Sequence, residues 1–186
     1  MLAREVAFAG RVWDVLSEVV DLGAAGAVTR DYIDHPGAVA VVALDEDERI
    51  VLIQQYRHPI GTFEWEIPAG LTDLEGEGPL ATAQRELAEE ADLYASRWHR
   101  LLEVATTPGS SSETIAIFLA RDLRSVAESE RHEREGEEHG MPRELVPLDE
   151  VRDAVLAGKL QNMTLAVAVL AACAARDVGW TSLREA

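Results

Sequence analysis

The stretch Gly70–Leu93, GLTDLEGEGPLATAQRELAEEADL, decides how this chain is organised. It opens with a loop that contains three glycines, and Pro79 then stands where the first turn of a helix accepts a proline. Apolar residues spaced three and four positions apart fall on one side of a helix that would run to about Ala91. These apolar residues are Leu80, Ala83, Leu87 and Ala91. The stretch therefore predicts an amphipathic helix packed against a core.

Three carboxylates lie on a different face of this predicted helix. Glu86, Glu89 and Glu90 are spaced i, i+3 and i+4, so their side chains are neighbours that repel one another by about 0.2–0.5 kcal/mol per pair. Negative charge is also unfavourable in the second half of a helix. A multivalent cation reverses this repulsion, and carboxylate oxygens suit Mg²⁺ or Mn²⁺. Taken alone, the same residues also fit a solvated acidic face.

The residues before the helix favour a cation-binding site over a solvated acidic face. Glu77 precedes Arg85 by eight positions, about two helical turns, so it can reach back to hold that arginine. The whole segment resembles the Nudix box, G-x5-E-x7-R-E-U-x-E-E-x-G-U, in which U is aliphatic. The matching residues are Glu77, Arg85-Glu86-Leu87, Glu89-Glu90 and Leu93. Two departures are six residues instead of five between Gly70 and Glu77, and Asp92 in place of the last glycine.

The resemblance implies a role for each matching position. Nudix proteins hydrolyse a nucleoside diphosphate linked to another group. Glu86 and Glu90 would bind the metal, Glu89 would assist, and the carbonyl of Ala69 would add a backbone ligand. Gly70, Glu77 and Arg85 would hold the geometry of the loop and helix.

Residues outside the box resemble the ADP-ribose pyrophosphatase branch of this family. They are Gln55-Tyr56-Arg57, Trp65-Glu66-Ile67-Pro68-Ala69-Gly70-Leu71, and Pro108-Gly109 with Glu113; Pro108 lies fifteen residues beyond Leu93. The resemblance makes Arg57 and Arg30 candidates for holding phosphate, because a guanidinium donates two hydrogen bonds to phosphate oxygens. Glu113 and Pro108 join the substrate-binding set. Trp13 or Tyr32 can stack on adenine, although a core or interface aromatic is the commoner role.

Hydrolysis also needs a base that takes a proton from the attacking water. In related pyrophosphatases a glutamate in the loop before the last strand serves. Here that loop carries Glu135-Gly136-Glu137-Glu138. We predict that the catalytic base is Glu138 or Glu137, which the sequence does not separate.

Composition limits the partners. The 186 residues include 34 acidic and 17 basic side chains, for a formal net charge of −17, and 47% of the residues are hydrophobic. Such a chain is long enough to bury a core. Its negative field disfavours nucleic acid and anionic membranes, and its apolar runs are too short to span a bilayer. We expect a cytoplasmic protein. Its charge does not exclude an anionic small molecule as a partner, provided that a cation or a local cluster of arginines mediates the binding.

Strand-like segments surround the helix. Gly37–Leu44 is apolar and Ile50–Arg57 begins with four apolar residues. These two strand-like segments flank a charged turn and predict a β-hairpin. Further strands are expected at 65–68, 101–105, 114–120 and 145–148, and further helices at about 149–158 and 162–175. The order of these elements predicts a mixed sheet covered by helices, and the resemblance implies the α/β (α+β) fold of the Nudix type, an α/β/α sandwich with a mixed sheet.

The amino-terminal part is expected to be separate from this sandwich. Residues 1–35 form strand-like pieces with too few apolar residues for a core, so we predict an N-terminal strand arm followed by a Nudix hydrolase domain at 36–186. Apolar residues of the arm, among them Phe8, Val12 and Trp13, would otherwise stay partly exposed. In the resembling branch such an arm pairs with a second subunit. We therefore expect a homodimer, the commonest closed assembly.

The resemblance implies Mg²⁺-dependent hydrolysis of ADP-ribose to AMP and ribose 5-phosphate, with Mn²⁺ as a possible substitute. One alternative is another nucleoside-diphosphate sugar, such as ADP-glucose or GDP-mannose. A second alternative is a sensor that binds ADP-ribose without cleaving it. The intact carboxylates of the box favour an enzyme over a sensor.

Overall fold

The computed structural model describes residues 1–134, 136 and 139–186. Three α-helices and eleven strands lie within these residues. The helices are α1 (Pro79–Ala91), α2 (Leu148–Leu156) and α3 (Met163–Asp177). The strands are β1 (Ala3–Phe8), β2 (Asp14–Asp21), β3 (Ala27–Asp34), β4 (Ala38–Ala43), β5 (Arg49–Arg57), β6 (Thr62–Glu66), β7 (Ala69–Leu71), β8 (Leu93–Ala105), β9 (Thr114–Ser125), β10 (Arg143–Pro147) and β11 (Arg184–Glu185).

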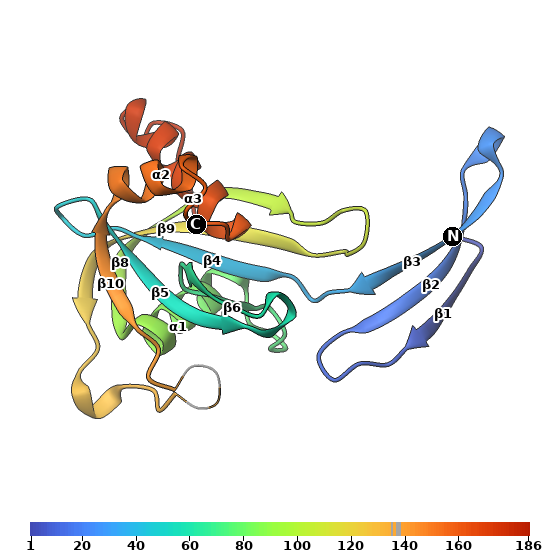
Figure 1. Cartoon of the computed structure of the whole chain (residues 1–186), viewed down its shortest axis with the longest axis horizontal. Coiled ribbons are helices and arrows are strands. Elements are labelled where there is room, and N and C mark those ends of the chain that lie inside the picture. Colours follow the sequence, from blue (N-terminus) through green and yellow to red (C-terminus); the bar gives the residue numbers. More distant parts are fainter. Residues whose placement is uncertain (135, 137–138) are drawn as a thin grey trace.

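The central sheet has the order β11-β8-β9-β4-β7, with β4 parallel to β9 and the other pairs antiparallel. Successive side chains of a strand point to opposite faces, and β4 shows this clearly. Ala40 and Val42 pack in the cluster that contains residues of α2 and α3, whereas Val39 and Val41 pack against α1. Helices therefore cover both faces (Figure 1). The predicted α/β/α sandwich with a mixed sheet is confirmed.

The predicted hairpin of β4 and β5 is wrong. Within the described structure the pairing of these strands is limited to one bridge between Leu44 and Ile50. β5 belongs instead to a second antiparallel sheet of order β10-β5-β6. Both edges of β4 are taken by β9 and β7, and both edges of β5 by β10 and β6, so neither strand has an edge left for the other.

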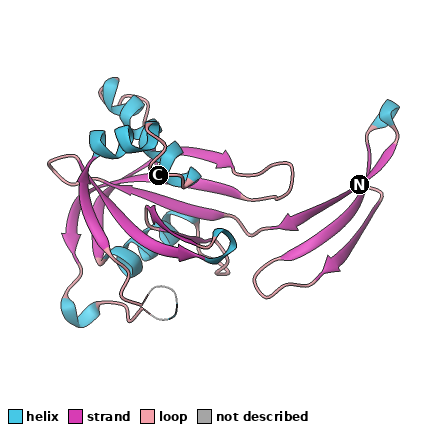
Figure 2. Ribbon diagram, in the orientation of Figure 1, coloured by secondary structure: helices cyan, strands magenta, loops and turns pink. Residues whose placement is uncertain are grey.

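The first three strands form an antiparallel sheet of their own, β1-β2-β3, which projects from the sandwich (Figures 1 and 2). It contacts the loop between β8 and β9 through two backbone hydrogen bonds. Ile33 N donates to Ser110 O, and Ser112 N donates to Ile33 O. Val6, Phe8 and Val12 are 54%, 65% and 61% exposed. The arm thus presents apolar side chains to its surroundings.

No helix among the described residues is long and apolar enough to cross a membrane.

Candidate active site

Helix α1 begins at Pro79 and ends at Ala91, as the sequence predicts. Gly78 is its N-cap residue, and Asp92 ends it in the left-handed conformation with φ 53° and ψ 39°. Two residues of the helix, Ala83 and Leu87, are fully buried on its inner face. This burial fixes the rotation of the helix, so its carboxylates face away from that core.

Arg85 lies at the centre of the carboxylate face. Its Nη1 donates hydrogen bonds to Glu86 at 2.7 Å and to Glu89 at 2.9 Å, and its Nη2 donates to Glu77 at 3.1 Å. The predicted contact between Glu77 and Arg85 is confirmed. The hydrogen bond between them raises the pKa of Arg85 and lowers the pKa of Glu77. The arginine therefore stays charged and joins the loop to the helix.

Glu90 faces β7 rather than Arg85. Its Oε2 accepts a hydrogen bond from the backbone N–H of Ala69 at 2.8 Å, and the residue is only 4% exposed. The neighbouring Gly70 lies directly against the side chain of Glu86. β7 and α1 thus bring Ala69, Gly70, Glu86 and Glu90 together, as the box resemblance implies.

A cavity of about 890 Å³ opens next to these residues. Its lining includes the predicted site residues Arg57, Ala69, Gly70, Arg85, Glu86, Glu90 and Glu113. They come from four separate parts of the chain, and the fold gathers them at one surface. This volume falls in the range of small-molecule sites.

Arg57 enters the cavity already paired with an acidic residue. Its Nε and Nη2 donate to the two carboxylate oxygens of Glu66, at 2.7 Å and 2.5 Å. The side chain of Glu66 is 5% exposed, whereas that of Arg57 is 43% exposed. The buried glutamate therefore aims the guanidinium while part of it remains accessible.

The other end of the cavity is aromatic and polar. The ring of Trp13 packs on the ring of His35, with centroids 5.2 Å apart. Nε2 of His35 lies 3.5 Å from Oε1 of Glu113, and the hydroxyl of Thr106 donates a hydrogen bond to the same carboxylate. This part of the lining therefore presents the flat ring of Trp13 together with the hydrogen-bonding groups of His35 and Glu113.

Several predicted residues lie outside this lining. Glu77 and Glu89 contact Arg85 but are absent from it, and Pro108 is in an exposed turn. Arg30 is exposed on the arm, where its Nη1 donates to Thr29 O. Tyr32 is half-buried in the arm. The predicted bases Glu137 and Glu138 lie outside the described residues.

Sequence reasoning assigned no role to His35, Glu66, Asn162 or Thr164, all of which line the cavity. One signal was present for Glu66, since a glutamate between Trp65 and Ile67 in a strand is a charge that needs a partner when buried. Nothing local marks the other residues, because they reach the cavity only through the fold.

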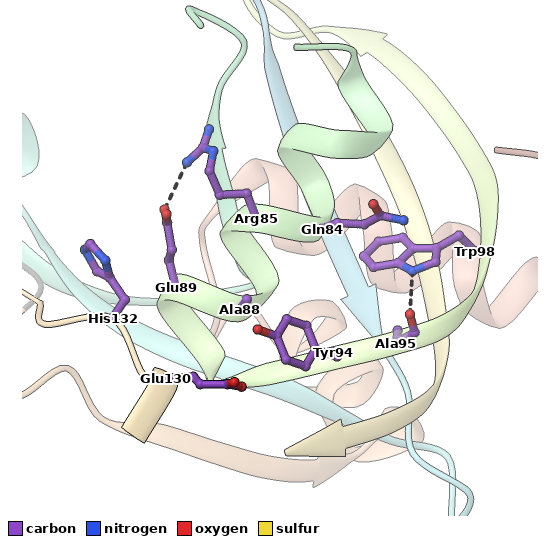
Figure 3. Close-up of a pocket in the computed structure, with 9 residues that line it drawn as sticks. All are labelled: Gln84, Arg85, Ala88, Glu89, Tyr94, Ala95, Trp98, Glu130 and His132. Atoms are coloured by element: carbon purple, nitrogen blue, oxygen red, sulfur yellow. Dashed lines mark hydrogen bonds and ion pairs between the residues drawn. The ribbon is translucent and has the colours of Figure 1, made fainter. Parts of the chain in front are cut away.

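A second hollow of about 590 Å³ lies on the outer side of α1 (Figure 3). Arg85 and Glu89 form one wall, and Tyr94 and Trp98 of β8 form another. Glu130 and His132, from the segment between β9 and β10, complete it. Arg85 therefore borders both hollows.

The donor atoms of the cavity fit a divalent cation in their chemistry, since carboxylate and carbonyl oxygens are what Mg²⁺ and Mn²⁺ prefer. Glu86 and Glu90 share the lining with Ala69. Within the described part of the chain, no three acidic, histidine or cysteine side chains form a ready-made metal cluster. Arg85 contacts one carboxylate oxygen each of Glu86 and Glu89.

A loop-to-helix segment with this carboxylate pattern, held in an α/β/α sandwich, defines the Nudix class of hydrolases. The chain belongs to the Nudix family, because the NUDIX domain matches residues 34–165. The match covers the box, strands β4 to β10 and helices α1 and α2, and it begins at Asp34, the last residue of β3.

Two relatives and one solved structure are similar to this chain over most of its length. The chain is 39% identical to an ADP-ribose pyrophosphatase of Mycobacterium tuberculosis over 170 residues, which is 91% of this chain and 81% of the relative. It is also 39% identical to an ADP-ribose pyrophosphatase of Bacillus subtilis over 136 residues, covering 73% of this chain and 72% of that protein. A crystal structure of an ADP compounds hydrolase superposes with a TM-score of 0.79 at 22% identity, covering 96% of this chain and 94% of that one. The last likeness shows the shared fold.

Proposed function

We propose that this protein hydrolyses ADP-ribose to AMP and ribose 5-phosphate. The observation that carries the proposal is the 39% identity to the M. tuberculosis ADP-ribose pyrophosphatase over 91% of the chain. The cavity supports it, because the box carboxylates meet Arg57 and Glu113 there. In the reaction a water oxygen attacks one phosphorus, the P–O bond of the pyrophosphate bridge breaks, and the bridging oxygen leaves with the other phosphate.

Glu86 and Glu90, with the carbonyl of Ala69, would hold Mg²⁺, and Glu89 would assist. Such a cation offsets the negative charge that develops on the phosphate oxygens. Mn²⁺ has similar ligand preferences and is expected to substitute. Arg85 and Glu77 keep the helix and its loop in register through their ion pair at 3.1 Å.

Arg57 would bind the pyrophosphate. Glu66 already holds its guanidinium in a fixed direction, which reduces the entropy lost when phosphate binds. At the other end of the cavity, Glu113 would accept hydrogen bonds from ribose hydroxyls. Trp13 would stack on the adenine, since its ring lines the cavity.

Glu138 or Glu137 would act as the general base. This assignment rests on the sequence and on the resemblance to related pyrophosphatases. A base must come within hydrogen-bonding reach of the attacking water.

The arm would pair two subunits into a homodimer. Support comes from its separate sheet and from the exposure of Val6 and Phe8, at 54% and 65%. Arg30 is exposed on this arm, where it could meet a phosphate in the site of the partner subunit. We propose the division into an arm at 1–35 and a Nudix hydrolase domain at 36–186, which the separate sheet of the arm supports.

Product release from a panel of nucleoside-diphosphate sugars tests the substrate. Purified protein is incubated with ADP-ribose, ADP-glucose or GDP-mannose, each with Mg²⁺ or Mn²⁺, and the nucleotide and sugar phosphate are quantified by chromatography. We expect the highest kcat/KM for ADP-ribose. A higher value for another sugar would reassign the substrate, and calorimetric binding of ADP-ribose without product would indicate a sensor.

A further inference from the structure

Asp92 stands at the end of α1, where the box pattern has a glycine. Its φ of 53° and ψ of 39° place it in the left-handed region, which residues with a β-carbon adopt at a cost. Its side chain is 5% exposed. A buried acidic residue that also adopts an unfavourable backbone conformation indicates that its carboxylate has a structural or functional role.

Three arginines surround that carboxylate. Nη2 of Arg134 lies 2.8 Å from Oδ1, and Nε of Arg131 lies 3.9 Å from Oδ2. Nη1 of Arg143 donates to Oδ2 and also to the backbone carbonyl of Ala91, the latter at 2.7 Å. The side chain of Arg134 is only 16% exposed, so its charge is balanced mainly by Asp92.

Two of the arginines lie in the connection between β9 and β10, and the third is at the start of β10. Arg131 and Arg134 follow β9, and Arg143 is the first residue of β10. The backbone carbonyl of Asp92 also accepts a hydrogen bond from Val126 N at 2.9 Å, just after β9. Asp92 therefore holds this connection near both of its ends, with its main chain and its side chain.

This connection borders the carboxylate face of α1. Glu130 and His132, on either side of Arg131, line the hollow that Arg85 and Glu89 also line (Figure 3). In the sequence, the predicted bases Glu137 and Glu138 follow Arg134 by three and four positions. Along the chain, two of these arginines therefore precede the residues expected to take the proton, and Arg143 follows them.

We propose that Asp92 is a positioning residue for the reaction. Its carboxylate, at the end of the helix that carries the proposed metal-binding glutamates, holds Arg131, Arg134 and Arg143 in register with that helix. The proposal rests on the proposed function in one respect, which is that the segment supplies the base. A glycine at position 92 would relieve the backbone but would leave Arg131, Arg134 and Arg143 without this anchor.

Two substitutions at position 92 separate the carboxylate from the backbone. Asp92→Asn keeps the size and tolerates the left-handed conformation, and Asp92→Gly removes the backbone cost. Both remove the charge. The matched control is Asp122→Asn, because Asp122 also has a positive φ of 57° and pairs with Arg97 at 3.0 Å, with both side chains 52% exposed.

The measurements are kcat and KM on the best substrate of the panel, and hydrogen exchange of peptides covering 127–142. We expect both Asp92 variants to lose on the order of tenfold to a hundredfold in kcat, the scale of a misplaced catalytic group, with little change in KM. Exchange should become faster in 127–142 and stay unchanged in β4 and β9. The Asp122→Asn protein should match the wild type in all respects.

Unchanged exchange in 127–142, or wild-type kcat with faster exchange there, would overturn the proposal. Equal acceleration across the whole chain would also overturn it, since that marks general destabilisation. Combining Asp92→Asn with Glu137→Gln or Glu138→Gln distinguishes its failure from that of the proposed base. If neither glutamine variant loses activity, the base assignment fails, and the exchange and kcat of Asp92→Asn still decide the role of Asp92.

Discussion

Glu86 lies so close to Gly70 that a β-carbon at position 70 would be 2.0 Å from Oε1 of Glu86. Real β-carbons do not approach an oxygen that closely, so any other residue would displace the carboxylate or β7. A β-carbon at position 70 would therefore force the side chain of Glu86, the first glutamate proposed to bind the metal, out of its present position.

We therefore predict that Gly70→Ala disables the enzyme by moving Glu86. Turnover at saturating Mg²⁺ should fall by about 10²-fold, the effect expected for a misplaced catalytic group. Gly109→Ala is the control, because a β-carbon there meets nothing within 4 Å. Titration of activity with Mg²⁺ checks the cause, and an unchanged requirement for Mg²⁺ would argue against displacement of a ligand.

Glu86→Gln and Glu90→Gln should each abolish most turnover and leave the fold intact. We expect a loss of at least about 10²-fold, the scale seen when an electrostatic stabiliser is removed. For Glu90→Gln the thermal midpoint without metal should hold or rise, because the amide oxygen can still accept from Ala69 N and a buried charge is gone. Near wild-type turnover of Glu90→Gln would refute the metal assignment.

The predicted base is tested by comparing Glu137→Gln with Glu138→Gln at saturating metal. One of them should lose on the order of 10²-fold or more in kcat, as expected when a general base is removed. Glu133→Gln, in the same connection, serves as a control for the change in local charge. Full activity of the double variant Glu137→Gln/Glu138→Gln would place the base elsewhere.

The pair of Glu77 and Arg85 should make stability depend on pH. Arg85 lowers the pKa of Glu77 below its ordinary value of 4.5, so the folded state binds the proton less readily than the unfolded state. The stabilisation is present above that value and is lost as pH falls through the lower, folded-state pKa. Thermal midpoints of wild type and Glu77→Gln should therefore differ at pH 7 and converge in acid. The exposed Glu75→Gln should show a smaller difference at pH 7.

Assembly through the arm is tested by light scattering over a series of protein concentrations. We expect a dimer for the full chain and a monomer for a variant with Val6→Asp and Phe8→Asp, because charges on these exposed apolar positions oppose burial. If the arm also reaches the partner's site, the KM of the variant should rise. A full chain that remains monomeric while it cleaves ADP-ribose would contradict the prediction.

The sequence by itself determined the helix and its chemical face. Three features of the helix depend only on residues one or two turns apart, so the sequence pattern predicts them. They are Pro79 at the start, the buried stripe of Ala83 and Leu87, and the carboxylates at i, i+3 and i+4. The contact between Glu77 and Arg85 was also within reach, because it spans a loop and two turns. The resemblance of this stretch to the Nudix box, together with the order of the strands around it, implied the Nudix fold.

Only the tertiary structure decided which sheet each strand joins and what surrounds the site. β4 is apolar throughout and β5 has an apolar run at 50–53, so the two look like neighbouring strands in the sequence. The strands that reach their edges separate them into two sheets. The pairing of Arg57 with Glu66 and of Asp92 with Arg134 likewise depends on burial. Such contacts form because a buried charge needs a partner, and the residue that supplies it is set by the packing of distant segments rather than by spacing along the chain.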